Sequence, residues 1–204
     1  MHARVHTRVL HSRYPLTMKT VFSTNNLLFA CSAVFALSAN TAQAANLCAG
    51  AVSYVVQPLI GGPAFDLCKA PAKAVLLVNT ASQCGFTPQY EGLEKLHQQY
   101  KSKGLMVVAL PANDFGHQET GANKQIADFC LVNYGVSFTV GEKLTTPIAK
   151  DPLYQKLIAA TGKSPSWNFH KYLITPDGKV QSFESRVEPL STAVTRAVNT
   201  ALAK

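Results

Sequence analysis

The sequence is poor in acidic residues, and the shortage is most marked at its N-terminus. Its 204 residues include 19 Lys or Arg and 11 Asp or Glu, which gives a formal net charge of +8. Residues 1–44 hold four of the basic residues and no acidic one, so the rest of the chain is only mildly basic. It shows no basic stripe with interleaved aromatic residues, and nucleic acid is therefore not an expected partner.

The N-terminal segment also lacks an apolar run long enough to cross a bilayer. Its apolar stretch, residues 27–37, has 11 residues, whereas a spanning helix needs about 20. Met18 and a lysine precede this stretch, and a small-residue cleavage motif ends at Ala44, which is typical of a secretory signal peptide. A membrane anchor, a buried helix or an organellar transit peptide are the alternatives.

We therefore expect a leader and signal peptide over residues 1–44, with the true start at Met1 or Met18, and a mature domain over residues 45–204. The mature protein would be exported, with the periplasm as the expected compartment, and would have no stable membrane insertion. Its four cysteines would meet an oxidising environment.

The chain lacks several motifs that would assign its cysteines at once. No His and Cys residues have the spacing of metal ligands, so no metal is expected. A Cys-x-x-Cys pair starting at Cys84 would need cysteine at position 87, which is Thr87. A peroxiredoxin motif would need threonine three residues before Cys84, where Ala81 stands. The catalytic base of a papain-type protease is not identifiable either.

Two apolar, β-branched runs predict the centre of the fold. Residues 74–80 and 105–110 are typical of strands buried on both faces, and an amphipathic helix pattern lies between them. This order implies a parallel strand pair. The Pro-Asp-Gly turn at 176–178 predicts a hairpin, which would add antiparallel strands. We therefore expect one α/β domain with a mixed central sheet flanked by helices.

Smaller elements can also be placed from the sequence. Candidate strands at 52–56 and 64–67 predict a small N-terminal hairpin. Thr87 is a candidate N-cap with proline at the first helical position, and Asn123 is a candidate cap of the next long helix. A short helix is expected over 152–160, and the last helix is expected from about Pro189 to Leu202.

Cys84 lies between a predicted buried strand and the first turn of a predicted helix. Ligands of α/β proteins bind at the carboxyl ends of strands. Helix N-termini offer unpaired N–H groups and positive partial charge, which stabilise a thiolate. The position therefore favours a reactive cysteine, although a small buried hydrophobic residue would fit it equally well.

Three motifs, in order and at family-like spacing, then resemble the glutathione peroxidase family in its cysteine form. They are "VNTASQCGFTPQY", "LPANDFGHQET" and "SPSWNFHKYLITPDGKV". The similarity runs from about residue 74 to residue 189. It implies a thioredoxin-like fold and a thiol peroxidase that reduces hydrogen peroxide or organic hydroperoxides.

The resemblance also implies a catalytic tetrad. The reactive sulfur falls on Cys84, and the family's Gln, Trp and Asn fall on Gln118, Trp167 and Asn168. Amide and indole N–H groups are neutral hydrogen-bond donors, suited to stabilising a thiolate and the oxygens of a peroxide. Taken singly, the three residues also fit non-catalytic roles: a core tryptophan, a solvated loop glutamine and an asparagine that hydrogen-bonds a turn.

Cys130 matches the resolving cysteine of the thioredoxin-dependent members of that family. It would condense with a Cys84 sulfenic acid, and a thioredoxin-like protein would reopen the disulfide. Because Cys130 lies in a predicted helix, we expect a wide gap between the two cysteines in the reduced state and local unwinding during turnover. The alternative is a buried apolar residue beside Ile126.

The sequence departs from the family pattern near the site. Ala112 replaces a family cysteine, Asp114 replaces a glutamine, and Thr120 replaces a proline. Asp114 would bring a negative charge near the thiol. The short segment between Leu144 and Trp167 lacks the interface loop of tetrameric relatives, so we expect a monomer.

Cys48 and Cys68 lie outside the family pattern. In an exported protein they are a candidate structural disulfide that staples the N-terminal hairpin, with two unpaired cysteines as the alternative.

The sequence thus predicts a thiol peroxidase that needs no cofactor. Its co-substrate would be a thiol reductant, either a thioredoxin-like protein or glutathione. Two further hypotheses remain open. One is a peroxide sensor or redox relay that passes oxidation to a partner protein. The other is a catalytically disabled scaffold that keeps only the fold.

Overall fold

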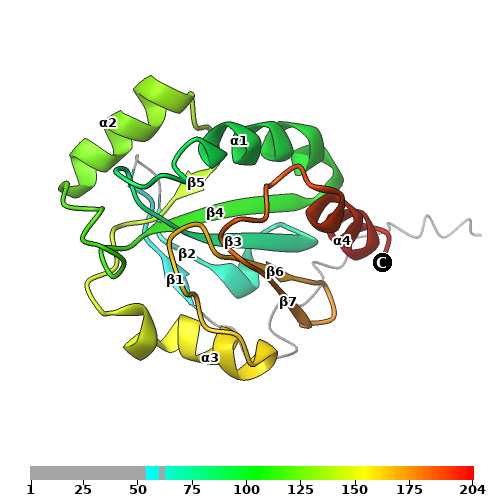
Figure 1. The fold of residues 1–204 in the computed structure, drawn as a ribbon. Coiled ribbons are helices and arrows are strands. Elements are labelled where there is room, and N and C mark those ends of the chain that lie inside the picture. Colours follow the sequence, from blue (N-terminus) through cyan, green and yellow to red (C-terminus); the bar gives the residue numbers. More distant parts are fainter. Residues whose placement is uncertain (1–53, 60–62) are drawn as a thin grey trace, which may run out of the picture. The chain divides into compact units, whose positions relative to one another are not determined.

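A computed structural model describes residues 54–59 and 63–204, which belong to one compact unit. The centre of this unit is a five-stranded mixed sheet (Figure 1). In spatial order its strands are β5 (Thr139–Val140), β4 (Leu105–Pro111), β3 (Ala74–Thr80), β6 (Lys171–Ile174) and β7 (Val180–Phe183). Its α-helices are α1 (Gln89–Tyr100), α2 (Asn123–Tyr134), α3 (Pro152–Thr161) and α4 (Thr192–Leu202).

The predicted parallel pair is confirmed as the middle of the sheet. β3 and β4 run parallel in continuous register from Ala74 opposite Leu105 to Thr80 opposite Pro111. On its other edge β3 pairs antiparallel with β6, which continues into β7 through the predicted hairpin. The carboxyl ends of β3 and β4 therefore lie together at one end of the sheet, where the chain leaves for the Cys84 loop.

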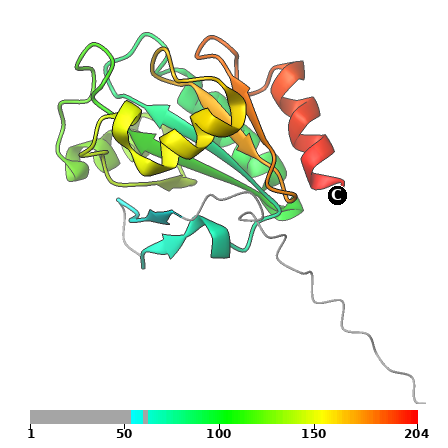
Figure 2. The ribbon, with the colours of Figure 1, turned by 90° about the horizontal axis from the view of Figure 1, so that it is seen from below.

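β3 is buried along its whole length, and its side chains alternate between two cores. Leu76 and Val78 face a core that also contains apolar residues of α1, α2 and α4. Val75 and Leu77 face the opposite core, which contains apolar residues of α3. This explains why the sequence run is continuously apolar, since both faces of the strand pack against other elements. In Figure 2, α3 (yellow) and α4 (red) lie apart from each other beside the sheet.

The small N-terminal hairpin is confirmed where the structure describes it. β1 (Val55–Val56) pairs antiparallel with β2 (Phe65–Asp66), and residues 52 and 53 lie outside the described residues. Val56 and Leu67 are buried and join the α3 side of the core. The hairpin therefore adds apolar cover to the sheet.

Three helix starts differ from the sequence prediction. α1 begins at Gln89, and Thr87 does not cap it, because the Thr87 hydroxyl bonds the preceding loop instead. α2 begins at Asn123 itself, whose side-chain oxygen accepts from the Lys143 backbone N–H rather than capping the helix. α4 begins at Thr192, later than predicted, because Ser191 caps it with a hydrogen bond to the Val194 N–H.

Strand β5 was not predicted from the sequence. It has only two residues and pairs parallel with Val108 and Ala109 of β4. Gly141 follows it, and an added Cβ there would lie 2.7 Å from the Leu110 side chain. The short strand thus depends on a close approach to β4. The sequence pattern of two residues is too short to predict it.

The packing of α1 gives a direct test of the core. Leu96 is fully buried on α1, so Leu96→Ala should lower the free energy of unfolding by about 2–5 kcal/mol. Leu190→Ala is the matched control, because Leu190 is 42% exposed and should cost under about 1 kcal/mol. Urea unfolding of both variants measures the difference. Equal losses would contradict the described core.

Candidate active site

Cys84 lies in the loop that joins β3 to α1, and the loop is held by hydrogen bonds within itself. The Thr87 hydroxyl accepts from the Cys84 N–H at 3.1 Å and donates to the Ala81 carbonyl at 2.9 Å. The Thr87 N–H donates to the Cys84 carbonyl at 3.0 Å. Thr87 thus fixes the backbone on both sides of the sulfur, which is why it is not available to cap α1.

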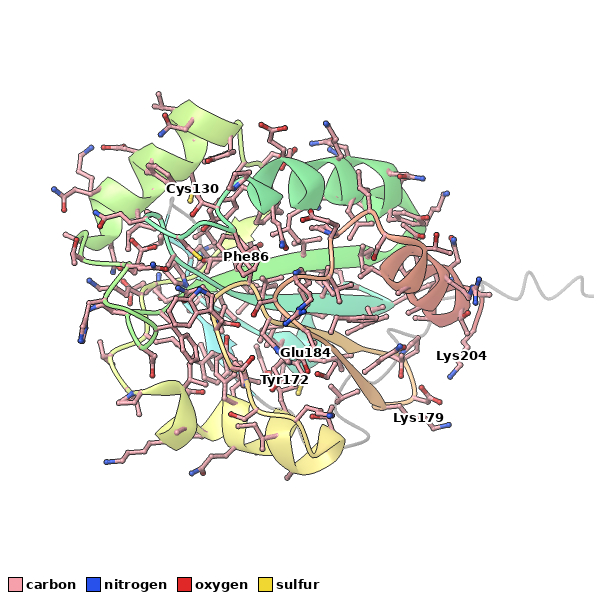
Figure 3. All side chains as sticks on the ribbon, in the orientation of Figure 1. Phe86, Cys130, Tyr172, Lys179, Glu184 and Lys204 are labelled. Atoms are coloured by element: carbon pink, nitrogen blue, oxygen red, sulfur yellow. The ribbon has the colours of Figure 1, made fainter. Side chains whose placement is uncertain are left out.

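The Cys84 thiol is nearly buried but has a backbone donor. Only 6% of the residue is exposed, and Cys84 Sγ accepts from the Phe86 N–H at 3.4 Å. Figure 3 labels Phe86, which follows Cys84 by two residues in this loop.

Gln118 comes from the loop that follows β4 and lies beside the Cys84 loop. Its carbonyl accepts from the Gln83 N–H at 3.0 Å. One step nearer the sheet, the Ala112 N–H donates to the Thr80 carbonyl at 2.9 Å. The two loops are therefore joined by backbone hydrogen bonds where the parallel strands end, and Gln118 is adjacent to the residue before Cys84.

Asn168 joins a third loop to the same place. It is fully buried, and its Nδ2 donates to Gln118 Oε1 at 3.1 Å and to the Phe115 carbonyl at 3.3 Å. With its oxygen engaged by Asn168, the Gln118 side chain has its Nε2 donors directed away from that bond. Asn168 is therefore a fixed partner of Gln118, and not a solvated turn residue.

Trp167 packs against the loop that follows β4 and carries Gln118. Its ring lies 5.9 Å, centroid to centroid, from the Phe115 ring, and an added Cβ on Gly116 would lie 3.4 Å from it. Trp167 is 38% exposed, so it is a partly exposed cover and not a core tryptophan. The structure thus links the loops of Cys84, Gln118, Trp167 and Asn168, although these residues are far apart in sequence.

Cys130 is in a different environment from Cys84. It lies on α2, fully buried, and Figure 3 shows it on the inner side of α2, toward α1. Burial raises the pKa of its thiol to about 11, partly offset by the neighbouring Tyr90 hydroxyl. Both Cys84 and Cys130 are free thiols. Cys130 packs in the same core as Ile126, as the alternative prediction for it required.

A buried carboxylate, not predicted from the sequence, is bonded to the Cys84 loop and lies near Cys130 of α2. Glu119 is 1% exposed, accepts from the Ser82 hydroxyl at 3.1 Å, and has a raised pKa because of its burial. A cavity of about 440 Å³ opens beside it, against α2. Its lining residues are Ser82, Gln83, Glu119, Thr120, Gly121, Gln125, Ile126 and Phe129. The motif "FGHQE" already contains Glu119, but its burial is visible only in the fold.

Asp114 has a structural partner. One oxygen of its carboxylate accepts from the Ile148 N–H at 2.8 Å, so Asp114 ties the loop after β4 to the segment that leads into α3. Its charge is among the causes that raise the pKa of Asp151, after burial of that residue. The predicted effect of Asp114 on the Cys84 thiol stays a prediction.

The remaining sequence predictions concern cysteines, metals and membranes. Cys68 is disulfide-bonded, but the predicted partner Cys48 lies outside the described residues, and this pairing stays a prediction. Within residues 54–59 and 63–204, no cluster of three or more His, Cys, Asp or Glu side chains could hold a metal ion. In the same ranges no helix is long and apolar enough to span a membrane.

Solved structures that share this fold include thiol oxidoreductases. A putative thiol:disulfide interchange protein from Chlorobium tepidum superposes with a TM-score of 0.55 at 22% identity, covering 75% of this chain and 95% of its own. At that identity the likeness shows the fold alone. The apo form of Trgpx superposes with a TM-score of 0.57 at 31% identity, covering 76% and 97% of the two chains. The expected thioredoxin-like α/β fold is thus confirmed.

Sequence comparison then identifies the family. Residues 53–158 match the glutathione peroxidase family. A glutathione peroxidase of Lactococcus lactis is 43% identical over 136 residues, which is 64% of this chain and 87% of that protein. A glutathione peroxidase-like peroxiredoxin of Saccharomyces cerevisiae is 40% identical over 141 residues, 66% and 86% of the two chains. The chain therefore belongs to the glutathione peroxidase family and is a glutathione peroxidase-like peroxidase.

The raised pKa of Cys130 leads to a testable difference between the two thiols. In the reduced native protein near pH 8, iodoacetamide should label Cys84 and leave Cys130 at least 10-fold less modified, because Cys130 is buried and remains a thiol. Peptide mass spectrometry after a timed quench measures both sites. Rapid labelling of Cys130 in the folded protein would contradict its described burial.

Proposed function

We propose that this protein reduces hydroperoxides with two cysteines, Cys84 as the nucleophile and Cys130 as the resolving residue, and that a thioredoxin-like dithiol protein regenerates it. The observation that supports this most is the position of Cys84, whose sulfur accepts a backbone N–H while its loop is bonded to that of Gln118. A relative from Synechocystis, 44% identical over 133 residues (64% of this chain and 85% of that one), is named a hydroperoxy fatty acid reductase.

In the first step the Cys84 thiolate attacks one oxygen of the hydroperoxide. An S–O bond forms and the O–O bond breaks, so Cys84 is oxidised by two electrons to a sulfenic acid. The other oxygen leaves with the electron pair of the broken bond and takes up a proton, giving water or an alcohol. Stabilising that developing negative charge is the main task of the surrounding residues.

Gln118 and Trp167 are the proposed direct donors. With Gln118 Oε1 engaged by Asn168, the Gln118 amide can present its N–H groups to the sulfur and the leaving oxygen. The Trp167 indole N–H adds a second neutral donor. Asn168 contributes through Gln118, because both acceptors of its amide, Gln118 and Phe115, are protein oxygens.

In the second step Cys130 would attack the sulfur of the Cys84 sulfenic acid. A disulfide forms and hydroxide leaves, which is protonated to water. The dithiol of the reductant then opens this disulfide by exchange and carries away the two electrons as its own disulfide. The support for this route over glutathione is the second free thiol, Cys130, which allows an internal disulfide.

In its present environment Cys130 would take this step only slowly. Its thiol is buried on an intact α2 and has a raised pKa, so little nucleophilic thiolate forms there. We infer that oxidation of Cys84 is followed by local unwinding of α2, which brings Cys130 out of the core. The proposal also includes export of the protein, which is based on the N-terminal sequence pattern. The thioredoxin-like reductant would then be in the same compartment.

Steady-state turnover tests the proposal. Peroxide consumption should proceed with thioredoxin and thioredoxin reductase, and much more slowly with glutathione at equal thiol concentration. Cys84→Ser should abolish turnover. Gln118→Ala should lower kcat/KM for peroxide roughly 100-fold, as loss of a donor to a developing oxyanion does. Gln181→Ala, at an exposed glutamine of β7, is the matched control and should leave turnover unchanged.

Two outcomes would contradict this function. If Cys84 is oxidised by peroxide but no dithiol reductant regenerates it, the protein is a sensor or relay that needs a particular client. If Gln118→Ala turns over at the rate of the Gln181→Ala control, the proposed donor role of Gln118 is wrong.

A further inference from the structure

Lys171 is a fully buried lysine in the middle of the sheet. It is the first residue of β6, pairs with Val78 of β3 and Phe183 of β7, and has no exposed surface. Lysine is almost never fully buried unless it is paired. No salt bridge to Lys171 occurs among residues 54–59 and 63–204, so its ammonium group must be accounted for by other contacts.

The ammonium group of Lys171 binds two backbone carbonyls. Its Nζ donates to the Phe169 carbonyl at 2.7 Å and to the Ser185 carbonyl at 3.3 Å. Phe169 directly follows Asn168, whereas Ser185 lies just after β7. Lys171 therefore ties the segment that carries Trp167 and Asn168 to the chain that leaves the sheet on its far edge.

Ser185 extends this tie toward α1 and Trp167. Its carbonyl also accepts from Gln89 Nε2, at the first residue of α1, at 2.8 Å. Its hydroxyl donates to the Trp167 carbonyl at 3.2 Å. Asn79 of β3 donates from Nδ2 to the same Trp167 carbonyl at 3.1 Å. The Trp167 backbone is thus held from two sides, by β3 and by Ser185.

The segment that these bonds hold has an unfavourable backbone conformation. Phe169 has a φ of +66°, in the left-handed region that is unfavourable for a bulky L-residue. Its N–H donates to the Asn79 carbonyl at 2.6 Å, and its carbonyl receives the Lys171 ammonium. Such a conformation persists only when its surroundings fix it, and here both peptide groups of Phe169 are fixed.

Packing alone does not require an ammonium group at this position. Burial lowers the pKa of Lys171 to about 7, with a smaller opposing effect from Glu188, so burying this amino group costs stability in either protonation state. A methionine of similar length would fill the same space without that cost. The hydrogen bonds to the two carbonyls are what a methionine would lose.

We propose that Lys171 is a positioning residue for peroxide reduction, which holds the Trp167–Asn168 segment in place against the loop that carries Gln118, through the carbonyls of Phe169 and Ser185. The inference rests on the proposed function of Cys84. Lys171 touches neither the sulfur nor a substrate. It acts by keeping Trp167 packed on Phe115 of the loop that carries Gln118 and Asn168 in its bond to Gln118.

This role predicts an effect on one chemical step and not on the other. The first step, attack of Cys84 on the peroxide, depends on Gln118, Trp167 and Asn168. The second step depends on Cys130 of α2, which Lys171 does not contact. Loosening the Trp167–Asn168 segment should therefore slow sulfenic acid formation and leave disulfide formation unchanged.

The test is Lys171→Met in the full chain, followed by stopped-flow mixing with hydrogen peroxide. Trp167 is the only tryptophan, so its emission reports directly on the held segment. The first step should slow by at least about 10-fold, since misplacing catalytic groups by about 1 Å can cost about 100-fold. The second step should stay within twofold, and the Trp167 emission of the reduced protein should shift.

Lys179→Met is the matched control, because Lys179 is an exposed lysine of the same hairpin whose side chain forms an ion pair with Asp177. It should leave both steps and the emission unchanged. If Lys171→Met does not fold, Ser185→Ala is the milder variant, because it removes only the hydroxyl bond to the Trp167 carbonyl. It should slow the first step by about three- to tenfold.

Two results would overturn the proposal. One is a first step in Lys171→Met, or in Ser185→Ala, within twofold of the parent. The other is equal slowing of both steps, which would indicate general loosening of the fold. A parent protein whose Cys84 does not react with peroxide would instead contradict the proposed function, and the Trp167 emission would still test the positioning contact.

Discussion

The site depends on the pairing of β3 with strands on both of its edges. Parallel pairing with β4 brings the Cys84 loop and the Gln118 loop out at the same end of the sheet. Antiparallel pairing with β6 brings the Trp167–Asn168 segment to that same end, because β6 begins where β3 finishes. The burial of β3 on both faces fixes this register, since a slip by one residue would exchange its two cores.

Both thiols are buried in the same core, but within residues 54–59 and 63–204 only Cys84 has a backbone donor to its sulfur. Cys84 lies in a loop with a backbone donor to its sulfur, and its neighbour Gln83 is bonded to Gln118. Cys130 lies in the core on α2, where burial keeps it a thiol. The difference suits a cycle in which one cysteine meets the peroxide and the other stays protected until a conformational change releases it.

Much of the fold and the identity of the site could be predicted from the sequence. The apolar runs of β3 and β4 predicted the parallel pair, and the Pro-Asp-Gly turn at 176–178 predicted the hairpin of β6 and β7. Family-like motifs predicted Cys84, Gln118, Trp167 and Asn168 together. The fold predictions are confirmed, because local pattern and residue type carry that information, whereas the catalytic role of the four site residues stays a prediction.

The contacts between distant segments could not be predicted in the same way. Even within one loop the local signal misleads: Thr87 is typical of a helix cap, but its hydroxyl donates to the Ala81 carbonyl six residues earlier. Lys171 reads as a surface residue of a strand, because its partners are backbone carbonyls that leave no sequence signal. Likewise, nothing in the sequence shows that Asn168 bonds to Gln118. The residue types of the candidate site could be predicted from the sequence, whereas the hydrogen bonds that orient them could be seen only in the fold.

The most direct measurement treats the reduced protein, from Ala45 onward, with one equivalent of hydrogen peroxide. Alkylation then traps the remaining thiols, and peptide mass spectrometry maps the cysteines. A Cys84–Cys130 disulfide is the result that the two-cysteine cycle predicts. A Cys84 that stops at sulfenic or sulfinic acid while Cys130 is alkylated would contradict the resolving role of Cys130.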